Sequence, residues 1–448
     1  MILNKISSFV ATSSGRTSTR IKAALSTSSS FVIQGQRSHI TTTSFSEKND
    51  NNNDIIPSMH SIQPQPITQF TEEERMVQQS IRTFAQNDIL PLVRQMENDQ
   101  QIHPQIISSL FENGLMGLEI PECYNGSNMN FTSACIAIEE ISKIDPSVAL
   151  LVDVQNTLIV NALRFWGSDE LQDEILPKLA LDTVGGFCLS EANAGTDAFA
   201  MGTKAVQSYD GSYYALHGSK MWISHAREAG LFIVFANVDP SKGYKGITAF
   251  VVDSDTDGIF IGPSESKLGL KACSTCPVTF DHVKVDASRV LGEVGLGYKY
   301  CIEILNEGRI GIAAQQIGIA KGCMDIVLPY LFERKQFGQA IGDFQGVQHQ
   351  YAQLSTEIHA AETMLYNACR LKENNLPFVK EASMVKLFSS QVAEKVTSKS
   401  IELLGGIGFT TETLVEKFYR DCKVGSIYEG TSNIQLQTIS KILKSEYS

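Results

Sequence analysis

One carboxylate, Glu429, stands in a short connection, residues 425–433, just ahead of a predicted helix near the end of the chain. Ser432 is a good N-cap residue and Gln435 follows three positions later, as in a capping box. Glu429 is therefore expected near a helix N-terminus, where Gly430 lets the backbone approach a ligand closely. A carboxylate in such a place can act as a general base when burial raises its pKa. Taken alone, however, the segment is more typical of a solvated loop glutamate.

Four other segments have residue types suited to a large planar cofactor with a phosphate tail. Residues 187–197 leave a strand-like run and enter a small-residue loop whose backbone groups and hydroxyls could bond a flat heterocycle. Trp222 could pack on a ring face, the basic pair at Arg334 suits a pyrophosphate, and the glycines of residues 402–409 permit close approach to a phosphate or ribose. Each segment alone also has an ordinary explanation as a turn, a solvated face or a core residue. No G-x-G-x-x-G motif opens a βαβ unit, which excludes a Rossmann fold.

The composition of the 448 residues is that of a globular protein, with 43% apolar and 19% charged residues. The net charge of -12 argues against a nucleic-acid partner. We expect no membrane span, because no apolar run reaches the length that a bilayer requires. Cys273 and Cys276 have C-x-x-C spacing, but no second pair or suitably spaced histidine completes a zinc site. We therefore expect no metal, and cysteines that remain reduced.

The first 46 residues differ in composition from everything that follows. They carry five lysines and arginines, no aspartate or glutamate, and many serines and threonines. This pattern is typical of a mitochondrial transit peptide, and a disordered basic tail is the alternative. Residues 47–63 are expected to form a disordered linker, because they begin with a run rich in Asn and Asp.

Hydrophobic periodicity divides the remaining chain into three regions. Helical spacing dominates residues 64–184, short β-branched and aromatic runs between turns dominate residues 185–295, and helical spacing returns in residues 296–448. Between Val347 and Ala368, apolar residues recur at alternating steps of four and three, which predicts a helix in a bundle. We predict an α+β multidomain protein with a helical N-terminal domain, an all-β middle domain and a C-terminal four-helix bundle. The expected strands cover residues 213–216, 220–223, 231–237, 246–252, 259–261 and 277–285.

Two long, spaced motifs together resemble the signatures of the acyl-CoA dehydrogenase family. The first begins at Cys188 and ends at Ala200, and the second begins at Glu402 and ends at Asp421. The resemblance covers essentially the whole chain after the predicted linker. Within the family, three runs are most similar to members that oxidise short 2-methyl-branched acyl-CoAs in isoleucine breakdown: residues 305–315, 343–350 and 427–435.

The resemblance implies FAD as cofactor and an acyl-CoA as substrate, and it carries residue roles with it. The residues that would line the isoalloxazine and ribityl groups are Phe187, Cys188, Leu189, Ser190, Glu191, Ala192, Asn193, Ala194, Gly195, Thr196, Trp222, Ile223 and Ser224. Those that would hold the adenine-diphosphate half, from a neighbouring subunit, are Arg334, Gln345, Glu402, Leu403, Leu404, Gly405 and Gly406. Thr431, Ser432 and Asn433 would also contact FAD. The acyl-CoA would contact Thr196, Tyr244, Tyr298, Asn306, Glu307, Gly308 and Arg309.

The resemblance also makes Glu429 the catalytic base. It would remove the α-proton of the thioester while the flavin N5 takes hydride from the β-carbon. The ribityl hydroxyl and the backbone N–H of Glu429 would stabilise the enolate oxygen. Some family members place the base just before the arginine that matches Arg309, but here that residue is Gly308, which cannot serve. Two departures from the common pattern are Asn193 in place of Gly and Glu402 in place of Gln.

The resemblance further implies a homotetramer in the mitochondrial matrix that passes electrons to electron-transfer flavoprotein. Three alternatives stay open at this point. The first is a related dehydrogenase with another chain preference, such as butyryl-CoA or isobutyryl-CoA. The second is an acyl-CoA oxidase, although the chain lacks the additional C-terminal domain that such oxidases usually carry. The third, from another class, is a non-catalytic flavin or acyl-CoA binding protein.

Overall fold

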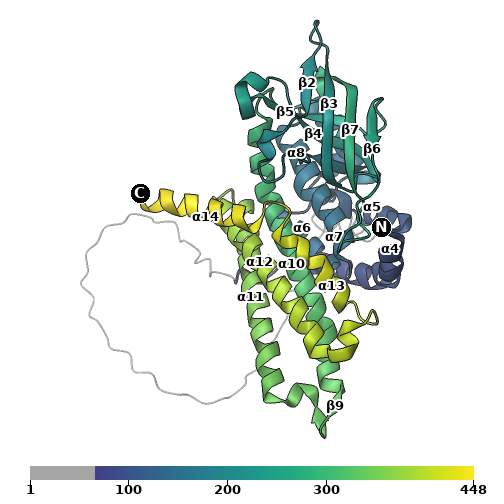
Figure 1. Cartoon of the computed structure of the whole chain (residues 1–448), viewed down its shortest axis with the longest axis vertical. Coiled ribbons are helices and arrows are strands. Elements are labelled where there is room, and N and C mark those ends of the chain that lie inside the picture. Colours follow the sequence, from purple (N-terminus) through teal and green to yellow (C-terminus); the bar gives the residue numbers. More distant parts are fainter. Residues whose placement is uncertain (1–65) are drawn as a thin grey trace, which may run out of the picture.

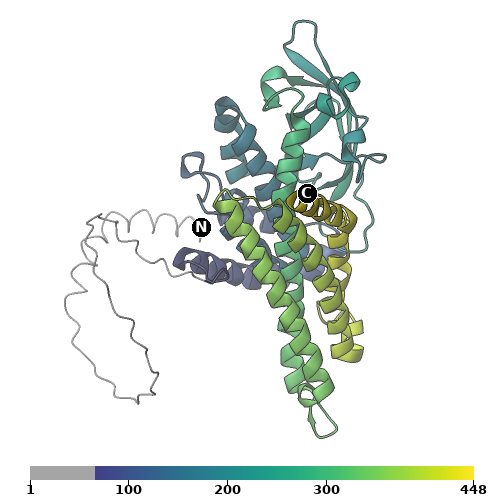
Figure 2. The ribbon, with the colours of Figure 1, turned by 90° about the vertical axis from the view of Figure 1, so that its left-hand side faces the viewer.

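The computed structural model describes residues 66–448, so the predicted transit peptide and linker lie outside the described residues. Figure 1 shows a β-sheet at one end of the molecule and a group of long helices at the other. One helix, α10 (Gly297–Glu333), begins beside the sheet and runs the length of the helical part, as the turned view in Figure 2 also shows. The predicted α+β organisation is confirmed.

The first part of the described chain is helical. Its α-helices are α3 (Glu72–Phe84), α4 (Val93–Asp99), α5 (Pro104–Glu112), α6 (Phe131–Ser142), α7 (Pro146–Asp153), α8 (Asn161–Trp166) and α9 (Asp169–Leu181). Polar side chains cap several of them, because the first N–H groups of a helix have no partner within it. The Thr71 hydroxyl caps α3 by accepting from Glu74 N–H at 3.1 Å. The Asp145 carboxylate does the same for α7, accepting from Ser147 N–H at 2.8 Å.

A single continuous helical stretch, Pro146–Trp166, joins α7 and α8 through the π-helix η5 (Val154–Val160). With 21 residues and a mean hydropathy of 1.3, it is long and apolar enough to cross a membrane. The expectation that no apolar run reaches that length is therefore wrong. Here 89% of its most apolar window is buried inside the protein, because it forms the centre of the helical core.

The middle part of the chain forms a sheet with the order β6-β7-β3-β2-β4-β5-β8, and β1 pairs in parallel with β4. Its strands are β1 (Val184–Cys188), β2 (Lys204–Gln207), β3 (Tyr213–Ser224), β4 (Ala229–Asn237), β5 (Ile247–Asp253), β6 (Ile259–Ile261), β7 (Thr275–Asp286) and β8 (Val290–Leu291). The two strands expected over residues 213–216 and 220–223 are one strand, β3, interrupted by register shifts against β7. Gly218, between the two predicted runs, lies at one of these shifts, where a β-bulge lets the strand continue.

Alternation along the strands decides which core each side chain joins. In β4, Leu231, Ile233 and Phe235 belong to a core shared with the N-terminal helices. Their neighbours Phe232 and Val234 point to the other face and join a core formed within the β part. Because successive strand side chains point to opposite faces, this continuous apolar run marks a strand covered on both sides.

The last part of the chain is again helical. Its elements are α10, the small hairpin of β9 (Lys335–Gln336) and β10 (Gln339–Ala340), α11 (Gln345–Glu373), α12 (Val379–Leu404), η10 (Gly405–Phe409), α13 (Val415–Cys422), η11 (Lys423–Ser426) and α14 (Ser432–Tyr447). The seam predicted on α11 is confirmed, since Leu354, Ile358, Ala361, Leu365 and Ala368 are all buried. The last helix, α14, projects from the side of the bundle in Figure 1.

Helix α10 packs closely on α6 because glycines face it. A Cβ on Gly318 would lie 2.4 Å from the carbonyl oxygen of Glu139, and one on Gly322 would lie 2.5 Å from that of Lys143. No side chain fits at either position. The N-terminal helices and the C-terminal bundle therefore share one hydrophobic core.

The start of α14 differs from the prediction by one residue. Thr431, not Ser432, is the N-cap, and its hydroxyl accepts from Ile434 N–H at 3.4 Å. Gln435 does not complete a capping box, because its amide is turned back to the carbonyl oxygens of Glu429 and Gly430. The polar residue predicted as part of a helix cap thus fixes the turn that carries Glu429.

Candidate active site

Glu429 occupies a tight turn between η11 and α14. Its φ of 50° and the φ of 83° at Gly430 both lie in the left-handed region, which is costly for a glutamate. Three bonds hold the turn: Gln435 Nε2 donates to Glu429 O at 3.1 Å and to Gly430 O at 2.9 Å, and Lys386 Nζ donates to Gly430 O at 2.6 Å. Backbone strain fixed by buried donors is typical of a residue whose side chain must point in one direction.

The Glu429 side chain lies against α10 at Gly308. A Cβ on Gly308 would come within 2.9 Å of Glu429 Oε2 and 2.9 Å of Leu158 Cδ2. Gly308 therefore does more than lack a carboxylate of its own: its missing side chain makes the space that the Glu429 carboxylate fills.

The electrostatic surroundings of Glu429 suit a base. Its Oε2 is buried and has no hydrogen-bond partner among the described residues. Burial raises the pKa of Glu429 to about 7, although the charges of Lys386 and Arg309 oppose this rise. At neutral pH the carboxylate is thus a stronger base than an exposed glutamate, and it remains substantially ionised.

Two cations reach this region from different helices. Lys386 of α12 is fully buried, and desolvation lowers its pKa to about 8 while Glu429 favours its charged form. Arg309 of α10 donates to Asn306 Oδ1 at 2.7 Å and to Ser383 Oγ at 3.2 Å. These bonds hold the guanidinium in place, and they give Asn306 a role within the protein.

Tyr428 anchors the other side of the turn. Its hydroxyl bonds Gln315 Oε1, and Gln315 Nε2 donates to Pro146 O at 2.8 Å. Sequence reasoning did not find Lys386, Tyr428 or Gln315 as site residues. In the sequence, Lys386 and Gln315 are polar residues on otherwise buried helix faces, and Tyr428 is an aromatic residue next to Glu429. Neither pattern is specific to an active site.

The loop after β1 is built around a buried ion pair. Lys220 of β3 is fully buried, and its ammonium donates to Glu191 Oε1 at 2.8 Å and to Leu189 O at 3.0 Å. Glu191 in turn accepts from Gly202 N–H at 2.7 Å and Thr203 N–H at 3.1 Å. Its carboxylate is therefore engaged within the protein, where it shapes the loop, rather than free for a ligand.

The rest of this loop faces outward. Cys188, Leu189 and Ala194 are buried, whereas Ala192, Asn193, Gly195 and Thr196 are exposed. Beside them Trp222 is 55% exposed with a φ of 65°, while Ile223 is buried and Ser224 is half-buried. Met221 N–H donates to Ser190 O at 2.8 Å, which joins the loop to the Trp222 strand. The exposed part of the loop, the Trp222 indole and the Ser224 hydroxyl together offer a surface on which a flat ring can stack.

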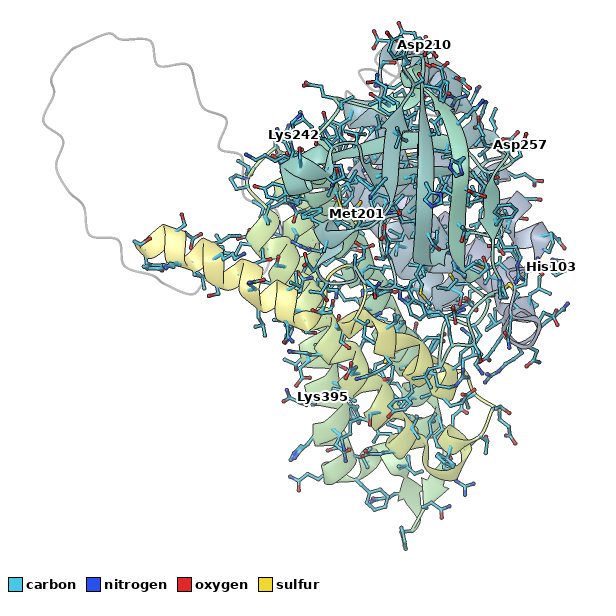
Figure 3. The ribbon with its side chains drawn as sticks, turned by 45° about the horizontal axis from the view of Figure 1, so that its top comes forward. His103, Met201, Asp210, Lys242, Asp257 and Lys395 are labelled. Atoms are coloured by element: carbon cyan, nitrogen blue, oxygen red, sulfur yellow. The ribbon has the colours of Figure 1, made fainter. Side chains whose placement is uncertain are left out.

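Two of the residues expected at the acyl-CoA lie together. The rings of Tyr244 and Tyr298 meet edge to face with centroids 5.0 Å apart, and Phe199 meets Tyr298 at 6.5 Å. Tyr244 belongs to the 3-10 segment η7 (Pro240–Gly246), whose Lys242 is labelled near the edge of the sheet in Figure 3. Met201, also labelled there, lies 3.7 Å from the buried Lys220 ammonium.

Glu307 points away from Glu429. Its Oε2 accepts from Asn161 Nδ2 at 2.7 Å and pairs with Lys372 at 3.1 Å. Burial raises the pKa of Glu307 to about 7. It lines a separate cavity of about 670 Å³ that also contains Glu119 and Lys372. If Glu307 contacts the substrate, it must therefore do so through its backbone or through a part of the substrate that enters this cavity.

The residues expected to hold the adenine half lie far from Glu429 in the same chain. An α-helix rises about 1.5 Å per residue, so Arg334, at the end of α10, is roughly 39 Å along the axis from Gly308. Arg334, Gln345, Glu402, Gly405 and Gly406 are all exposed, and no atom lies within 4 Å of a Cβ built on either glycine. Leu403 and Leu404 are buried and can offer only backbone groups. Within a single chain, Glu429 and the residues expected at the adenine half therefore lie at well-separated places along the bundle.

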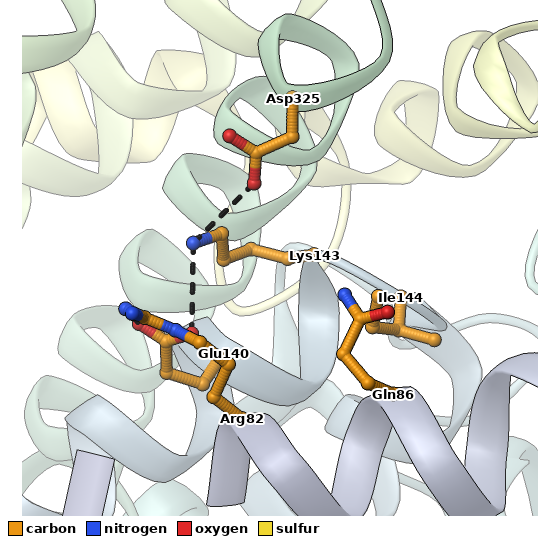
Figure 4. A pocket seen from close by; sticks show the side chains of 6 residues that line it. All are labelled: Arg82, Gln86, Glu140, Lys143, Ile144 and Asp325. Atoms are coloured by element: carbon orange, nitrogen blue, oxygen red, sulfur yellow. Dashed lines mark hydrogen bonds and ion pairs between the residues drawn. The ribbon is translucent and has the colours of Figure 1, made fainter. Parts of the chain in front are cut away.

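Two other clusters lie apart from this site. Figure 4 shows a small polar pocket where Lys143 bridges Glu140 at 3.5 Å and Asp325 at 3.4 Å, and Arg82 pairs with Glu140 at 2.9 Å. These ion pairs join α3, α6 and α10 and explain the polar lining. Among the described residues, one exposed group has metal-ligand atoms within 4.8 Å of one another: His217, Asp281 and His282. The expectation of no metal stays a prediction.

Three known domain families match the chain, one for each of its three parts and in the same order along the sequence. They are "Acyl-CoA dehydrogenase, N-terminal domain" over residues 71–182, "Acyl-CoA dehydrogenase, middle domain" over 186–283 and "Acyl-CoA dehydrogenase, C-terminal domain" over 295–444. The chain belongs to the acyl-CoA dehydrogenase family.

Individual members of the acyl-CoA dehydrogenase family are similar over nearly their full length. The mitochondrial short/branched chain specific acyl-CoA dehydrogenase of Rattus norvegicus is 52% identical over 85% of this chain and 88% of its own length. A probable short/branched chain specific acyl-CoA dehydrogenase of Dictyostelium discoideum is 53% identical over 84% of this chain and 91% of its own. The solved butyryl-CoA dehydrogenase of Megasphaera elsdenii superposes with a TM-score of 0.82 at 33% identity, covering 84% of this chain and 99% of that one. The predicted family and fold class are confirmed.

Proposed function

We propose that this acyl-CoA dehydrogenase is a mitochondrial FAD enzyme that introduces an α,β double bond into short and branched acyl-CoAs, with 2-methylbutyryl-CoA as its preferred substrate and Glu429 as its base. The observation that carries the proposal is the Glu429 carboxylate. Glu429 is half-buried as a residue, but its Oε2 is buried and has no hydrogen-bond partner among the described residues, and its pKa of about 7 suits proton abstraction at neutral pH.

The residues present fit FAD. Exposed Trp222 and the outward part of the loop from Ser190 to Thr196 offer a stacking face and backbone groups beside the β-sheet. Exposed Arg334 and the open glycines Gly405 and Gly406 offer a cradle for phosphates and ribose. When bound, FAD would supply the hydride acceptor for the β-carbon.

Three residues of this chain would then take part in the reaction: Glu429, Lys386 and Arg309. Glu429 accepts the α-proton on Oε2, the carboxylate oxygen that has no hydrogen-bond partner among the described residues. Among the described residues no hydrogen bond uses the Glu429 backbone N–H, so it is available to donate to the thioester carbonyl oxygen as charge develops there. Lys386 and Arg309 keep the carboxylate ionised until substrate arrives, and exclusion of water strengthens each of these interactions.

We further propose a homotetramer in which each FAD bridges two chains. The separation between Gly308 and Arg334 along α10 supports this, because the flavin-side and adenine-side residues of one chain lie too far apart to serve one cofactor. Exposed apolar side chains at the same end of the bundle, including Phe337 and Phe409, support a covered surface there. Electron-transfer flavoprotein is the proposed electron acceptor, and the matrix the proposed location.

The test is an anaerobic titration of the purified mature protein with 2-methylbutyryl-CoA, isobutyryl-CoA, butyryl-CoA and isovaleryl-CoA, following the visible flavin spectrum. We expect bleaching, fastest with 2-methylbutyryl-CoA, and its loss by orders of magnitude in a Glu429→Gln variant that keeps its FAD. Fastest bleaching with butyryl-CoA or isobutyryl-CoA would retain the reaction and correct the chain preference. A yellow protein that bleaches with none of them would favour a binding protein, and one that takes up no FAD would overturn the proposal.

A further inference from the structure

A second carboxyl, Asp153, is buried beside the same helix as Glu429. It is the last residue of α7, directly before the π-helix η5, and only 2% of it is exposed. A Cβ on Gly311 would lie 1.9 Å from Asp153 Oδ1, so this carboxyl fills the space above Gly311. Gly308 and Gly311 are three residues apart on α10 and therefore share a face. The two acids thus occupy adjacent glycine notches, one helical turn apart.

The carboxyl of Asp153 has little around it that could compensate a negative charge, since the one side-chain donor that reaches it among the described residues is the Thr157 hydroxyl. The Thr157 hydroxyl oxygen lies 2.8 Å from Asp153 Oδ1 and 2.9 Å from the Asp153 backbone oxygen. The hydroxyl has one hydrogen for these two oxygens. At most one of the two contacts can therefore be a full hydrogen bond, and a bond donated to Oδ1 opposes only in part the rise that burial causes in the pKa of Asp153.

Asp153 and Glu429 also differ in the charged groups that surround them. No lysine, arginine or histidine of residues 66–448 forms an ion pair with Asp153, whose titratable neighbours are Glu429, Tyr428 and the Cys135 thiol of α6. Glu429, in contrast, faces both Lys386 and Arg309. Burial raises the pKa of Asp153 well above its ordinary value, and the charge on Glu429 raises it further. Burial thus raises both pKa values, but only Glu429 has nearby cations that favour its ionised form, a difference in surroundings like that in enzymes that divide acid and base roles between two carboxyls.

We propose that Asp153 is a positioning residue that serves as the un-ionised partner of Glu429, so that two buried carboxyls carry one negative charge and that charge stays on Glu429. The developing enolate then faces one anion instead of two. The link to catalysis rests on the proposed function of Glu429, whereas the protonation of Asp153 can be measured without any substrate.

The first experiment measures thermal midpoints of the FAD-loaded protein against pH. An aspartate whose folded pKa is raised ionises more readily when unfolded, so its contribution to stability falls as pH rises above the unfolded pKa of about 3.9. Asp153→Asn has no ionisable group at this position and therefore does not lose stability in this way as pH rises. The difference in midpoint between Asp153→Asn and wild type should therefore increase in favour of the variant from about pH 5 to about pH 8.

The matched control is Asp257→Asn, which replaces an aspartate at an exposed turn labelled in Figure 3. The change in the midpoint difference with pH should be larger for Asp153→Asn than for this variant. Adding Glu429→Gln removes a neighbouring charge that favours the acid form of Asp153. The advantage of Asp153→Asn should therefore level off at a lower pH in that background. A difference between Asp153→Asn and wild type that does not change with pH would show Asp153 to be ionised and would overturn the proposal.

The second experiment follows kcat against pH. Asp153→Ala leaves a space beside Glu429 that water can enter, so the pKa of Glu429 and the acid limb should move to lower pH, with kcat reduced about tenfold. Asp153→Asn should return the acid limb to the wild-type position, because it replaces one uncharged group by another. A shift of the acid limb in Asp153→Asn would contradict the proposal, and persistent turnover in Glu429→Gln would instead contradict the proposed function.

Discussion

At the scale of single residues, Glu429 is an ordinary weak acid whose surroundings change its chemistry. Desolvation raises its pKa, and two cations limit the rise, so that base strength and ionisation are balanced near neutral pH. In the proposed reaction, Lys386 and Arg309 therefore act on Glu429 through charge, and Gly308 acts through the space that it leaves.

The pH dependence of turnover follows from this balance. Because Glu429 must be ionised to accept a proton, kcat should rise with pH to a plateau with an apparent pKa of about 7. Lys386→Met removes a charge that favours the ionised form, and should move this limb to higher pH. Stopped-flow reduction of the flavin at a series of pH values measures both. A limb that stays in place in Lys386→Met would show that Lys386 does not act on Glu429 through charge.

Gly308→Ala tests the space around the base. The new methyl group would lie 2.9 Å from Glu429 Oε2 and from Leu158 Cδ2, so the carboxylate must move. A displacement of the base by about 1 Å is enough to lower kcat about 10²-fold. Gly346→Ala in α11, where no atom lies within 4 Å of the added carbon, is the matched control. Equal kcat in the two variants, with FAD retained, would rule out this role for Gly308.

At the scale of elements, the loop after β1 depends on a lysine that lies in another strand. The Lys220 ammonium is buried in β3 and holds Glu191, which in turn fixes the backbone at Gly202 and Thr203. Buried ion pairs of this kind add little stability compared with apolar residues, but they define one loop conformation. Here that conformation is the one that exposes residues 192–196, apart from the buried Ala194.

Lys220→Met should break this arrangement. It leaves a carboxylate without its cation, which typically costs about 3–5 kcal/mol of unfolding free energy. We expect a lower thermal midpoint and weaker FAD retention after dilution. Lys178→Met removes an exposed lysine 3.1 Å from Glu174 and should change stability by less than about 1 kcal/mol. Equal losses in the two variants would contradict the loop-holding role of Lys220.

At the scale of the whole molecule, α10 sets the distances. Its 37 residues carry Gly308 in their first third and lead to Arg334 directly after the last turn. The rise along this helix separates Gly308, which lies against Glu429, from Arg334, and this separation is the physical basis for the proposed sharing of each FAD between chains.

Mixed oligomers test this sharing. Glu429→Gln and Arg334→Ala chains with different tags should each be impaired alone, the first in proton abstraction and the second in FAD retention. When they are co-expressed and purified through both tags, one site in a mixed pair combines the intact Glu429 of one chain with the intact Arg334 of the other. Activity above that of either parent is the expected result. No recovery in oligomers proven to contain both chains would place the whole FAD site within one chain.

Much of this protein could be derived from residue patterns alone. Periodicity predicted helical, β and helical regions in order, and the two spaced motifs pointed to the family, while Glu429 and Gly308 pointed to the proposed base. These are local properties, because side-chain period and motif spacing are determined by neighbouring residues. The tertiary structure decided the rest. It moved the N-cap to Thr431, turned Gln435 back onto the Glu429 turn and joined two predicted strands into β3. It also brought Lys386, Arg309 and Asp153 to the base from three different helices. Burial and charge at Glu429 depend on residues distant in sequence, so only the folded chain determines its pKa.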